Sequence, residues 1–103
     1  MPRRRRRRAS SPPAVHFDTG ASPACTVVEV RADDEPGLVY RITATLEALG
    51  CDITFAKIAT EKSQALDVFY VTDGSGRALP ASEQPRVELA LLTALGAKER
   101  LSS

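Results

Sequence analysis

The residues best placed to do chemistry are the five at positions 34–38, Asp-Glu-Pro-Gly-Leu, which join an apolar segment to an amphipathic one. Proline suits the first turn of a helix, where its missing N–H removes a donor that would lack an acceptor anyway. Asp34 is the predicted N-cap, and Gly37 leaves room for another backbone or a ligand to approach. Because the first amides of a helix lack partners within it, they can hold a carboxylate. The joint is therefore predicted to bind a small molecule rather than to catalyse a reaction.

This joint must be held by a strand before it and a helix after it. Residues 26–31 are rich in β-branched side chains, which favours a strand. The segment after the joint places apolar residues at helical spacing, so one face of the predicted helix is apolar. These residues are Leu38, Ile42, Leu46 and Leu49. Gly50 suits the left-handed conformation that ends many helices, so the helix is predicted to stop there.

Two more strands and a second helix are predicted in the C-terminal half. Residues 53–60 and 65–72 have the composition of strands, separated by the polar turn 61–63. The unbroken apolar run 68–71 indicates a central strand that is covered on both faces. Residues 80–82 lead into the second helix. Its apolar stripe consists of Val87, Leu91 and Leu95, with Gly96 after it.

A further short strand is predicted at residues 15–18, which alternate in polarity and precede a turn-forming segment. The order strand, strand, helix, strand, strand, helix implies a split βαβ unit, with the third core strand inserted between the first and second. The predicted fold class is α+β, a ferredoxin-like sandwich with an antiparallel sheet and two helices on one face. The usual last strand after the second helix is missing, and residues 15–18 are expected to fill that vacant edge beside residues 26–31.

The length of 103 residues suits one small domain, predicted to span residues 15–97. Residues 1–14 are expected to be a disordered tail and residues 98–103 a frayed C-terminus. No segment is long and apolar enough to span a membrane. Cys25 and Cys51 make neither a disulfide framework nor a metal set, so each is expected to be a small apolar residue in a reducing cytoplasm.

The formal net charge of +1 conceals a basic tail and an acidic body. Residues 3–8 are six arginines, so residues 9–103 carry 8 basic and 13 acidic side chains, a net charge of −5. An acidic body makes nucleic acid an unfavourable main ligand, because phosphate binding needs a basic face. The tail could still bind RNA, anionic lipid or an acidic partner, or it could be a solvated linker.

No constellation of catalytic residues is found, so this chain alone is not expected to be an enzyme. His16 has no acid, cysteine or second histidine at ligand or triad spacing, and it is expected to lie on an edge strand. The glycine-containing loop at residues 73–76 lacks the following Lys-Ser/Thr of a phosphate-binding loop. No cofactor and no metal are predicted.

The strand residues are apolar on both faces of the predicted sheet, yet the helices cover only one face. An exposed apolar face or edge on so small a domain is typical of a partner surface. We therefore predict a homodimer, or docking onto a neighbouring domain.

The segment 26–42, with its Asp-x-Pro-Gly-Leu joint after the first strand, resembles an ACT domain, a family that regulates amino-acid metabolism. Residues 58–60, followed by Asp-Val-Phe-Tyr-Val-Thr-Asp at 67–73, are similar to the C-terminal ACT domain of the PII uridylyltransferase/uridylyl-removing enzymes. Residues 15–18 are similar to the Val-x-Phe-Asp segment that precedes that domain. The nucleotidyltransferase and HD phosphohydrolase motifs of those enzymes are not found in this sequence.

The resemblance implies an amino-acid sensor in nitrogen regulation, with glutamine as the implied ligand. It places the ligand between the joint of one ACT domain, which supplies Asp34, Gly37 and Leu38, and the second core strand of a facing copy. That strand supplies Asp52 and Ile53. The amides of Gly37 and Leu38 would hold the α-carboxylate, and Asp34 or Asp52 would accept from the α-ammonium. The alternatives are an interaction module without a ligand and a nucleic-acid or acidic-partner binder that uses the tail.

Overall fold

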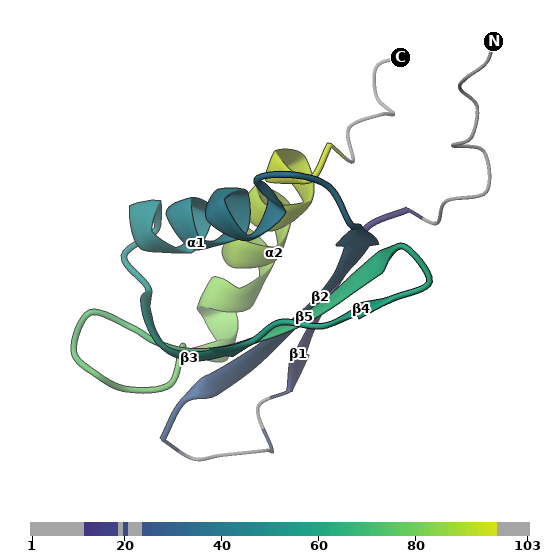
Figure 1. Cartoon of the computed structure of the whole chain (residues 1–103). Helices are drawn as coiled ribbons and strands as arrows, with labels where there is room; N and C mark the ends of the chain where they lie inside the picture. Colours follow the sequence, from purple (N-terminus) through teal and green to yellow (C-terminus); the bar gives the residue numbers. More distant parts are fainter. Residues whose placement is uncertain (1–11, 19, 21–23, 97–103) are drawn as a thin grey trace, which may run out of the picture.

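The fold is described by a computed structural model, which covers residues 12–18, 20 and 24–96. Figure 1 shows one sheet with both helices packed on the same face. The predicted α+β ferredoxin-like sandwich is therefore confirmed. In chain order the elements are β1 (Ala14–Asp18), β2 (Thr26–Asp33), α1 (Leu38–Ala48), β3 (Asp52–Lys57), β4 (Thr60–Glu61), β5 (Gln64–Thr72), the 3-10 turn η2 (Ala81–Glu83) and α2 (Gln84–Ala94).

The strand order β1-β2-β5-β3 places β5 between β2 and β3, as the split βαβ unit predicts. Every pairing is antiparallel, and the short β4 pairs with β5 beyond the end of β3. β1 pairs with β2 from Ala14 opposite Arg31 to Asp18 opposite Val27, so the N-terminal strand fills the vacant edge as predicted. β3 forms the opposite edge, and within the described part of the chain its outer side has no strand partner.

The core lies between the sheet and the two helices. Alternate residues of the two central strands face the helices. The buried apolar residues on that face are Val28, Val30, Ala32, Ala65, Phe69 and Val71. The helices contribute Leu38, Ile42 and Leu46 from α1 and Val87 and Leu91 from α2. On the opposite face, Val68 and Tyr70 are only half-buried. The prediction that β5 is covered on both faces is therefore wrong for a single chain.

The strand predicted at residues 53–60 contains a bulge that turns one aromatic side chain. The pairing of β3 with β5 shifts register between Ile53 and Phe55, so Thr54 is an extra residue on the edge strand. Its hydroxyl donates to the carbonyl oxygen of Tyr70 at 3.1 Å. The shift brings Phe55 opposite Tyr70, and the two rings meet edge to face with their centroids 5.4 Å apart.

Beyond the bulge the predicted strand is divided into β3 and β4, which leaves Ile58 and Ala59 in neither strand. β4 then returns into β5 through a two-residue turn at Lys62 and Ser63. Both residues have left-handed backbone angles, with φ of 52° and 70°, as the tight turns of twisted hairpins require. The turn predicted at residues 61–63 is therefore confirmed within one residue.

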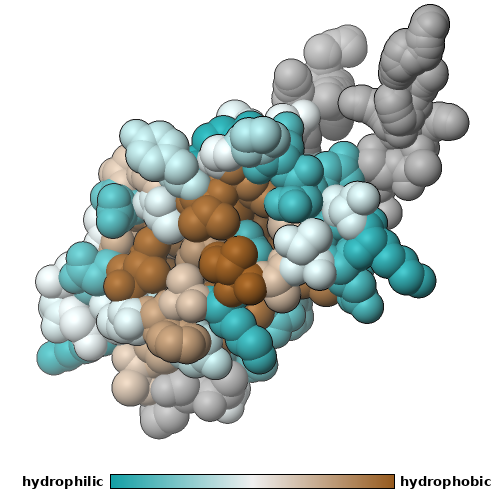
Figure 2. Space-filling model, viewed as in Figure 1, coloured by the Kyte–Doolittle hydropathy of each residue, from teal (hydrophilic) through white to brown (hydrophobic). Residues whose placement is uncertain are grey.

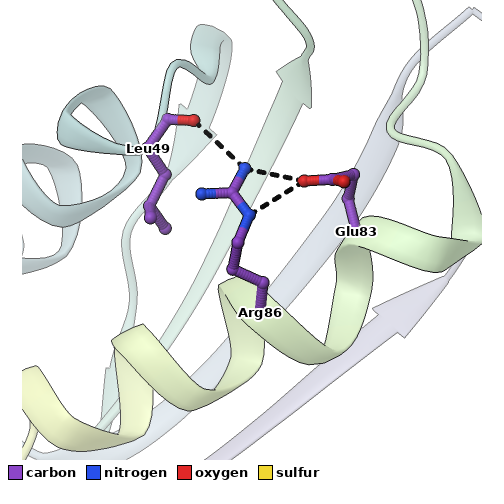
Figure 3. Close-up of polar contacts among 3 residues, drawn as sticks. All are labelled: Leu49, Glu83 and Arg86. Atoms are coloured by element: carbon purple, nitrogen blue, oxygen red, sulfur yellow. Dashed lines mark hydrogen bonds and ion pairs between the residues drawn. The ribbon is translucent and has the colours of Figure 1, made fainter.

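A contact between the helices fixes the C-terminal end of α1. The helix stops at the predicted Gly50, whose φ is 86°. The guanidinium of Arg86 on α2 donates to the carbonyl oxygen of Leu49 at 3.4 Å and pairs with Glu83 at 2.7 Å (Figure 3). A cation at this end of a helix satisfies a free carbonyl and is favoured by the helix dipole. The contact therefore holds α1 against α2 at the end opposite the joint.

Two predictions fall largely on residues outside the described part, namely the tail at residues 1–14 and the frayed end at residues 98–103. Residues 12–14 are described, and Ala14 already belongs to β1. None of the described helices is long and apolar enough to cross a membrane.

Candidate functional site

The joint between β2 and α1 is built as a four-residue turn of type II. The Leu38 N–H donates to the Glu35 carbonyl oxygen at 3.2 Å and closes the turn. Pro36 takes its second position, and Gly37 takes its third with φ of 79° and ψ of 4°. Gly37 is also the N-cap of α1, and no side chain caps the helix, so the prediction of Asp34 as the N-cap is wrong. A Cβ at Gly37 would meet no atom within 4 Å, so the backbone angle alone requires glycine.

The turn decides which amides of the joint remain free. The Leu38 amide is engaged in the turn, and the side chain of Leu38 is 2% exposed in the core. The first helical hydrogen bond runs from the Arg41 N–H to the Gly37 carbonyl oxygen at 2.9 Å. In the described residues, the amides of Gly37, Val39 and Tyr40 find no acceptor. The positive end of α1 therefore presents three unpaired donors.

Contacts on both sides hold the joint in place. The Asp34 N–H donates to the carbonyl oxygen of Ser63 at 2.9 Å, which ties the joint to the β4–β5 turn. Glu35 pairs with Arg41 at 2.9 Å across the start of the helix. The Asp34 carboxylate is exposed and has no partner among residues that the structure describes. The joint thus combines free amides with a free acid.

A buried acid that was not among the predicted site residues lies on β5, three residues from Gln64, whose partner Asp33 precedes the joint. Asp67 on β5 is 1% exposed, and it is the only charged side chain in the described core. Its Oδ1 accepts a hydrogen bond from the Ala59 N–H over a long 3.4 Å, whereas its Oδ2 has no partner. The sequence does carry a signal, because alternation along a strand puts Asp67 on the same face as Phe69.

The environment of Asp67 disfavours its charge. Burial raises the pKa of Asp67 above its ordinary value, the Ala59 N–H lowers it, and the nearby charge of Asp34 raises it again. Ion pairs in the described chain join Arg41 to Glu35 and Arg86 to an acid of η2, so neither Asp67 nor Asp34 is neutralised. Two acids near each other without a cation favour the binding of a positively charged group.

The other two predicted site residues lie at the far end of the sheet. Asp52 pairs with Thr72 at one end of β5, whereas the joint lies beside Gln64 at the other end. The step from Gln64 to Thr72 corresponds to roughly 26 Å of strand. Asp52 is exposed and Ile53 is half-buried. One chain therefore keeps Asp34 and Asp52 apart, and only a facing copy could bring them together, as the sequence analysis assumed.

Exposed apolar side chains occur at the start of α1 and in or just after β3. Val39 and Tyr40 at the start of α1 are 36% and 74% exposed, and Phe55 and Ile58 are 59% and 50% exposed. Figure 2, with α1 and β3 toward the viewer, shows hydrophobic side chains near the centre of this side with polar side chains around them. Since the outer side of β3 is also a free strand edge, this surface has the character of a partner contact.

A concave region lies on the sheet face away from the helices. Its volume is about 470 Å³, and charged and apolar side chains alternate around it. The lining residues are Ala14, His16, Glu29, Val30, Arg31, Leu66, Asp67 and Val68. His16 lies on the edge strand β1 directly opposite Glu29, which confirms its predicted edge position. No pattern in the sequence predicts this hollow.

The glycine-containing loop after β5 is closed by its own aspartate. The Asp73 Oδ1 accepts from the Ser75 N–H at 2.8 Å, the Ser75 hydroxyl at 2.7 Å and the Arg77 N–H at 3.0 Å. The Arg77 N–H and then the Ser75 donors hold the pKa of Asp73 below its ordinary value. A carboxylate therefore occupies the donors that a phosphate would need, which agrees with the missing phosphate-loop motif.

The structure supports neither a nucleophile nor a metal site at the two cysteines. Both are free, and Cys51 is buried. Burial is the main reason that the pKa of the Cys51 thiol is raised, which keeps it protonated and unreactive. No cluster of three metal-binding side chains occurs within residues 12–18, 20 and 24–96.

Comparison with known proteins agrees with the sequence resemblance. The family described as ACT domain matches residues 26–83, which is more than half of the chain. A bifunctional uridylyltransferase/uridylyl-removing enzyme of Streptomyces coelicolor is 44% identical over 86 residues, covering 84% of this chain and 10% of that enzyme. The enzyme of the same name from Azospirillum brasilense is 48% identical over 65 residues, covering 63% of this chain and 7% of that enzyme. One from a Bradyrhizobium species is 38% identical over 88 residues, covering 84% of this chain and 10% of that enzyme.

This chain thus spans at most about a tenth of the length of these relatives. No solved structure matches it. The matched part contains the joint, the edge strand β3 and the whole of β5.

Proposed function

The chain belongs to the ACT domain family, and on that premise we propose that it is a regulatory module that binds a free amino acid, with glutamine as the first candidate. The curated relatives are named as uridylyltransferase/uridylyl-removing enzymes, and the match covers only their ACT-like part. The proposed role is to report amino-acid supply to such an enzyme in nitrogen regulation, either as one of its parts or as a separate module.

The observation that carries this proposal is the pairing of free donors with a free acid at the joint. An α-amino acid bears a carboxylate and an ammonium on the same carbon. The unpaired amides of Gly37, Val39 and Tyr40 suit the carboxylate, because they lie at the positive end of α1. The unpaired Asp34 carboxylate suits the ammonium. Gly37 keeps the approach open, because no atom lies near the place of its missing Cβ.

A second copy of the chain would complete the site. Antiparallel pairing of two β3 edges reverses the direction of the second strand. Asp52 and Ile53 of one copy would then lie near the Lys57 end of the other, which is the end that carries the joint. Two equivalent ligand sites per dimer follow from the symmetry. The exposed apolar side chains of α1 and β3 would be covered by the same contact.

Such a site transmits a signal through the dimer. A ligand that touches both copies binds the paired arrangement more tightly than the separated one, and it can shift the equilibrium only by that difference. Binding is therefore expected to stabilise the dimer, and dimerisation to raise the affinity for the ligand.

A second candidate function is a dimerisation module that needs no ligand, and the exposed apolar side along α1 and β3 favours it. Nucleic-acid binding through residues 3–8 concerns a segment outside the described residues. Reading of RNA on the sheet face is not favoured, because Phe69 is fully buried against the helices and Tyr70 is half-buried.

Titration calorimetry of the full chain against the amino acids tests the proposal. We expect L-glutamine to bind with one site per chain, and Asp34→Asn to weaken the binding about tenfold or more, because a charge-assisted hydrogen bond is lost. Sedimentation with and without glutamine follows the dimer in parallel. A stable dimer that binds no amino acid at millimolar concentration would replace the sensor by the ligand-free module.

A further inference from the structure

Asp67 is an acid at a core position of β5, where an apolar side chain is expected. Its neighbours on the same face of β5, Ala65 and Phe69, are buried and apolar, and Val30 lies directly opposite it on β2. A buried charge whose only hydrogen bond is 3.4 Å long lowers stability, and an apolar residue of similar volume avoids that cost. A buried acid that does not stabilise the core is a candidate for a role in binding.

Asp67 lies on β5 three residues from Gln64, which pairs with Asp33 next to the joint, and its Oδ2 is buried without a partner. The negative charge of Asp34 contributes to the raised pKa of Asp67, after burial. The Ala59 N–H contacts Oδ1, and the Ala59 carbonyl oxygen accepts from the Leu66 N–H at 2.9 Å. Ile58 and Ala59 belong to neither β3 nor β4 and are exposed. The Asp67 carboxylate is therefore hydrogen-bonded to an exposed segment of the chain that belongs to neither strand.

The chemistry of the two acids selects the class of group that binds there. No lysine or arginine of the described chain pairs with Asp67 or Asp34. A divalent metal ion needs more ligands than two acids, and the described residues hold no third metal-binding side chain near them. An ammonium group can be held by two carboxylates, and the free amides of α1 next to them suit a carboxylate.

We propose that Asp67 is the buried receptor for the ammonium group of the amino-acid ligand, with Oδ2 accepting its hydrogen bond at the floor of the joint site. This inference rests on the proposed function and deepens it by adding a recognition residue from β5. It explains why an unpaired acid is kept in the core, since the ligand supplies the missing partner. It also makes the site selective for α-amino acids over carboxylic acids that lack the ammonium group.

The test compares three forms of the full chain with two ligands. The forms are the wild type, Asp67→Asn and the control Asp33→Asn, which makes the same substitution at an exposed residue next to the joint. The ligands are L-glutamine and glutaramate, which is glutamine without the ammonium group. We expect Asp67→Asn to bind L-glutamine about 10- to 100-fold more weakly than the wild type, the cost of a lost hydrogen bond to a charged group. Its affinity for glutaramate should be unchanged, and Asp33→Asn should match the wild type with both ligands.

Each other outcome overturns a defined part of the reasoning. If Asp67→Asn binds L-glutamine as tightly as the wild type, the role of Asp67 is refuted while the sensor function stands. If it loses L-glutamine and glutaramate equally, Asp67 is only a structural residue. A wild type that binds no amino acid overturns both proposals.

A measurement on the wild type alone covers the case in which Asp67→Asn does not fold. The carboxyl carbon of Asp67 is titrated by NMR with and without saturating L-glutamine. An ammonium group at Oδ2 stabilises the charged acid, so the pKa of Asp67 should fall on binding. Glutaramate should not lower it. An unchanged pKa with L-glutamine bound refutes the contact.

Discussion

Replacing Gly37 by alanine isolates the backbone conformation on which the joint depends. Gly37 has φ of 79°, and a Cβ built there meets no atom within 4 Å. The substitution therefore causes no collision, and only the left-handed conformation penalises an L-residue, by about 1–2 kcal/mol. Alanine also reduces the freedom of the unfolded chain, which offsets about 0.4–1 kcal/mol of that penalty. The net loss of unfolding free energy is expected to be about 1 kcal/mol, or about 4–8 °C in Tm for a domain of this size.

D-Alanine at position 37 reverses the sign of the effect. A D-residue prefers positive φ, so the penalty disappears while the entropic gain of about 0.4–1 kcal/mol remains. The variant can be assembled from two synthetic segments joined between Gly50 and Cys51, a junction suited to cysteine ligation. Gly74→Ala is the matched control. Its backbone angle is not left-handed and its Cβ would lie at an ordinary 4.0 Å from the Gly50 carbonyl oxygen, so it should change stability by less than about 0.5 kcal/mol.

Unfolding of the four chains by urea and by heat, followed by circular dichroism, gives the comparison. The expected order of stability is D-alanine at position 37, then the wild type and Gly74→Ala together, then Gly37→Ala. If the L- and D-alanine chains were equally destabilised, the space around Gly37 would be filled rather than open. The joint could then not admit a ligand as described.

Three further predictions concern the rest of the molecule. Burial raises the pKa of Asp67 above its ordinary value of 3.8. Protonation of Asp67 therefore stabilises the fold below pH 3.8, and this stabilisation is lost as the pH rises from 3.8 through the raised pKa. Without ligand, Asp67→Asn should therefore be more stable than the wild type at neutral pH by about 1 kcal/mol, with the difference closing in acid, as unfolding at several pH values will measure. Phe55→Lys places like charges across the proposed two-fold contact of β3 edges and should shift the sedimentation equilibrium toward monomer, whereas Leu89→Lys on exposed α2 should not. Arg86→Met removes the cation from the C-terminal end of α1 and should lower the unfolding free energy by about 0.5–1 kcal/mol, as thermal unfolding will measure. The loss should be smaller at high salt. An equal loss of stability in Glu83→Gln would show that the ion pair with Glu83, and not the contact with the Leu49 carbonyl oxygen, stabilises the fold.

The fold follows from the sequence because its local signals agree with one another. The stripe of Leu38, Ile42 and Leu46 fixed the face of α1, and the alternation in residues 15–18 was enough to place β1 at the vacant edge. The bulge at Thr54 was not predictable, because it depends on how the edge strand fits β5 rather than on any local preference.

The site at the joint stays a prediction, and the structure changes its expected hydrogen bonding. Asp-Glu-Pro-Gly suits both a capped helix start and a type II turn, and the structure has the turn, which moves the N-cap from Asp34 to Gly37 and engages the Leu38 amide. Asp67 was overlooked because the apolar run that indicated a central strand covers residues 68–71 and begins just after it. Strict alternation with Phe69 would have placed it in the core, and an acid in a core position is a signal that sequence alone can provide.

The most direct test of the account is an NMR titration of the ¹⁵N-labelled chain with L-glutamine, read at the backbone amides. The amides predicted to hold the ligand carboxylate are those of Gly37, Val39 and Tyr40. We expect the largest shift changes at these three, saturating together with a stoichiometry of one ligand per chain. Changes centred instead on His16, Glu29 and Arg31 would move the site to the hollow on the other face of the sheet, and no saturable change anywhere would contradict amino-acid binding altogether.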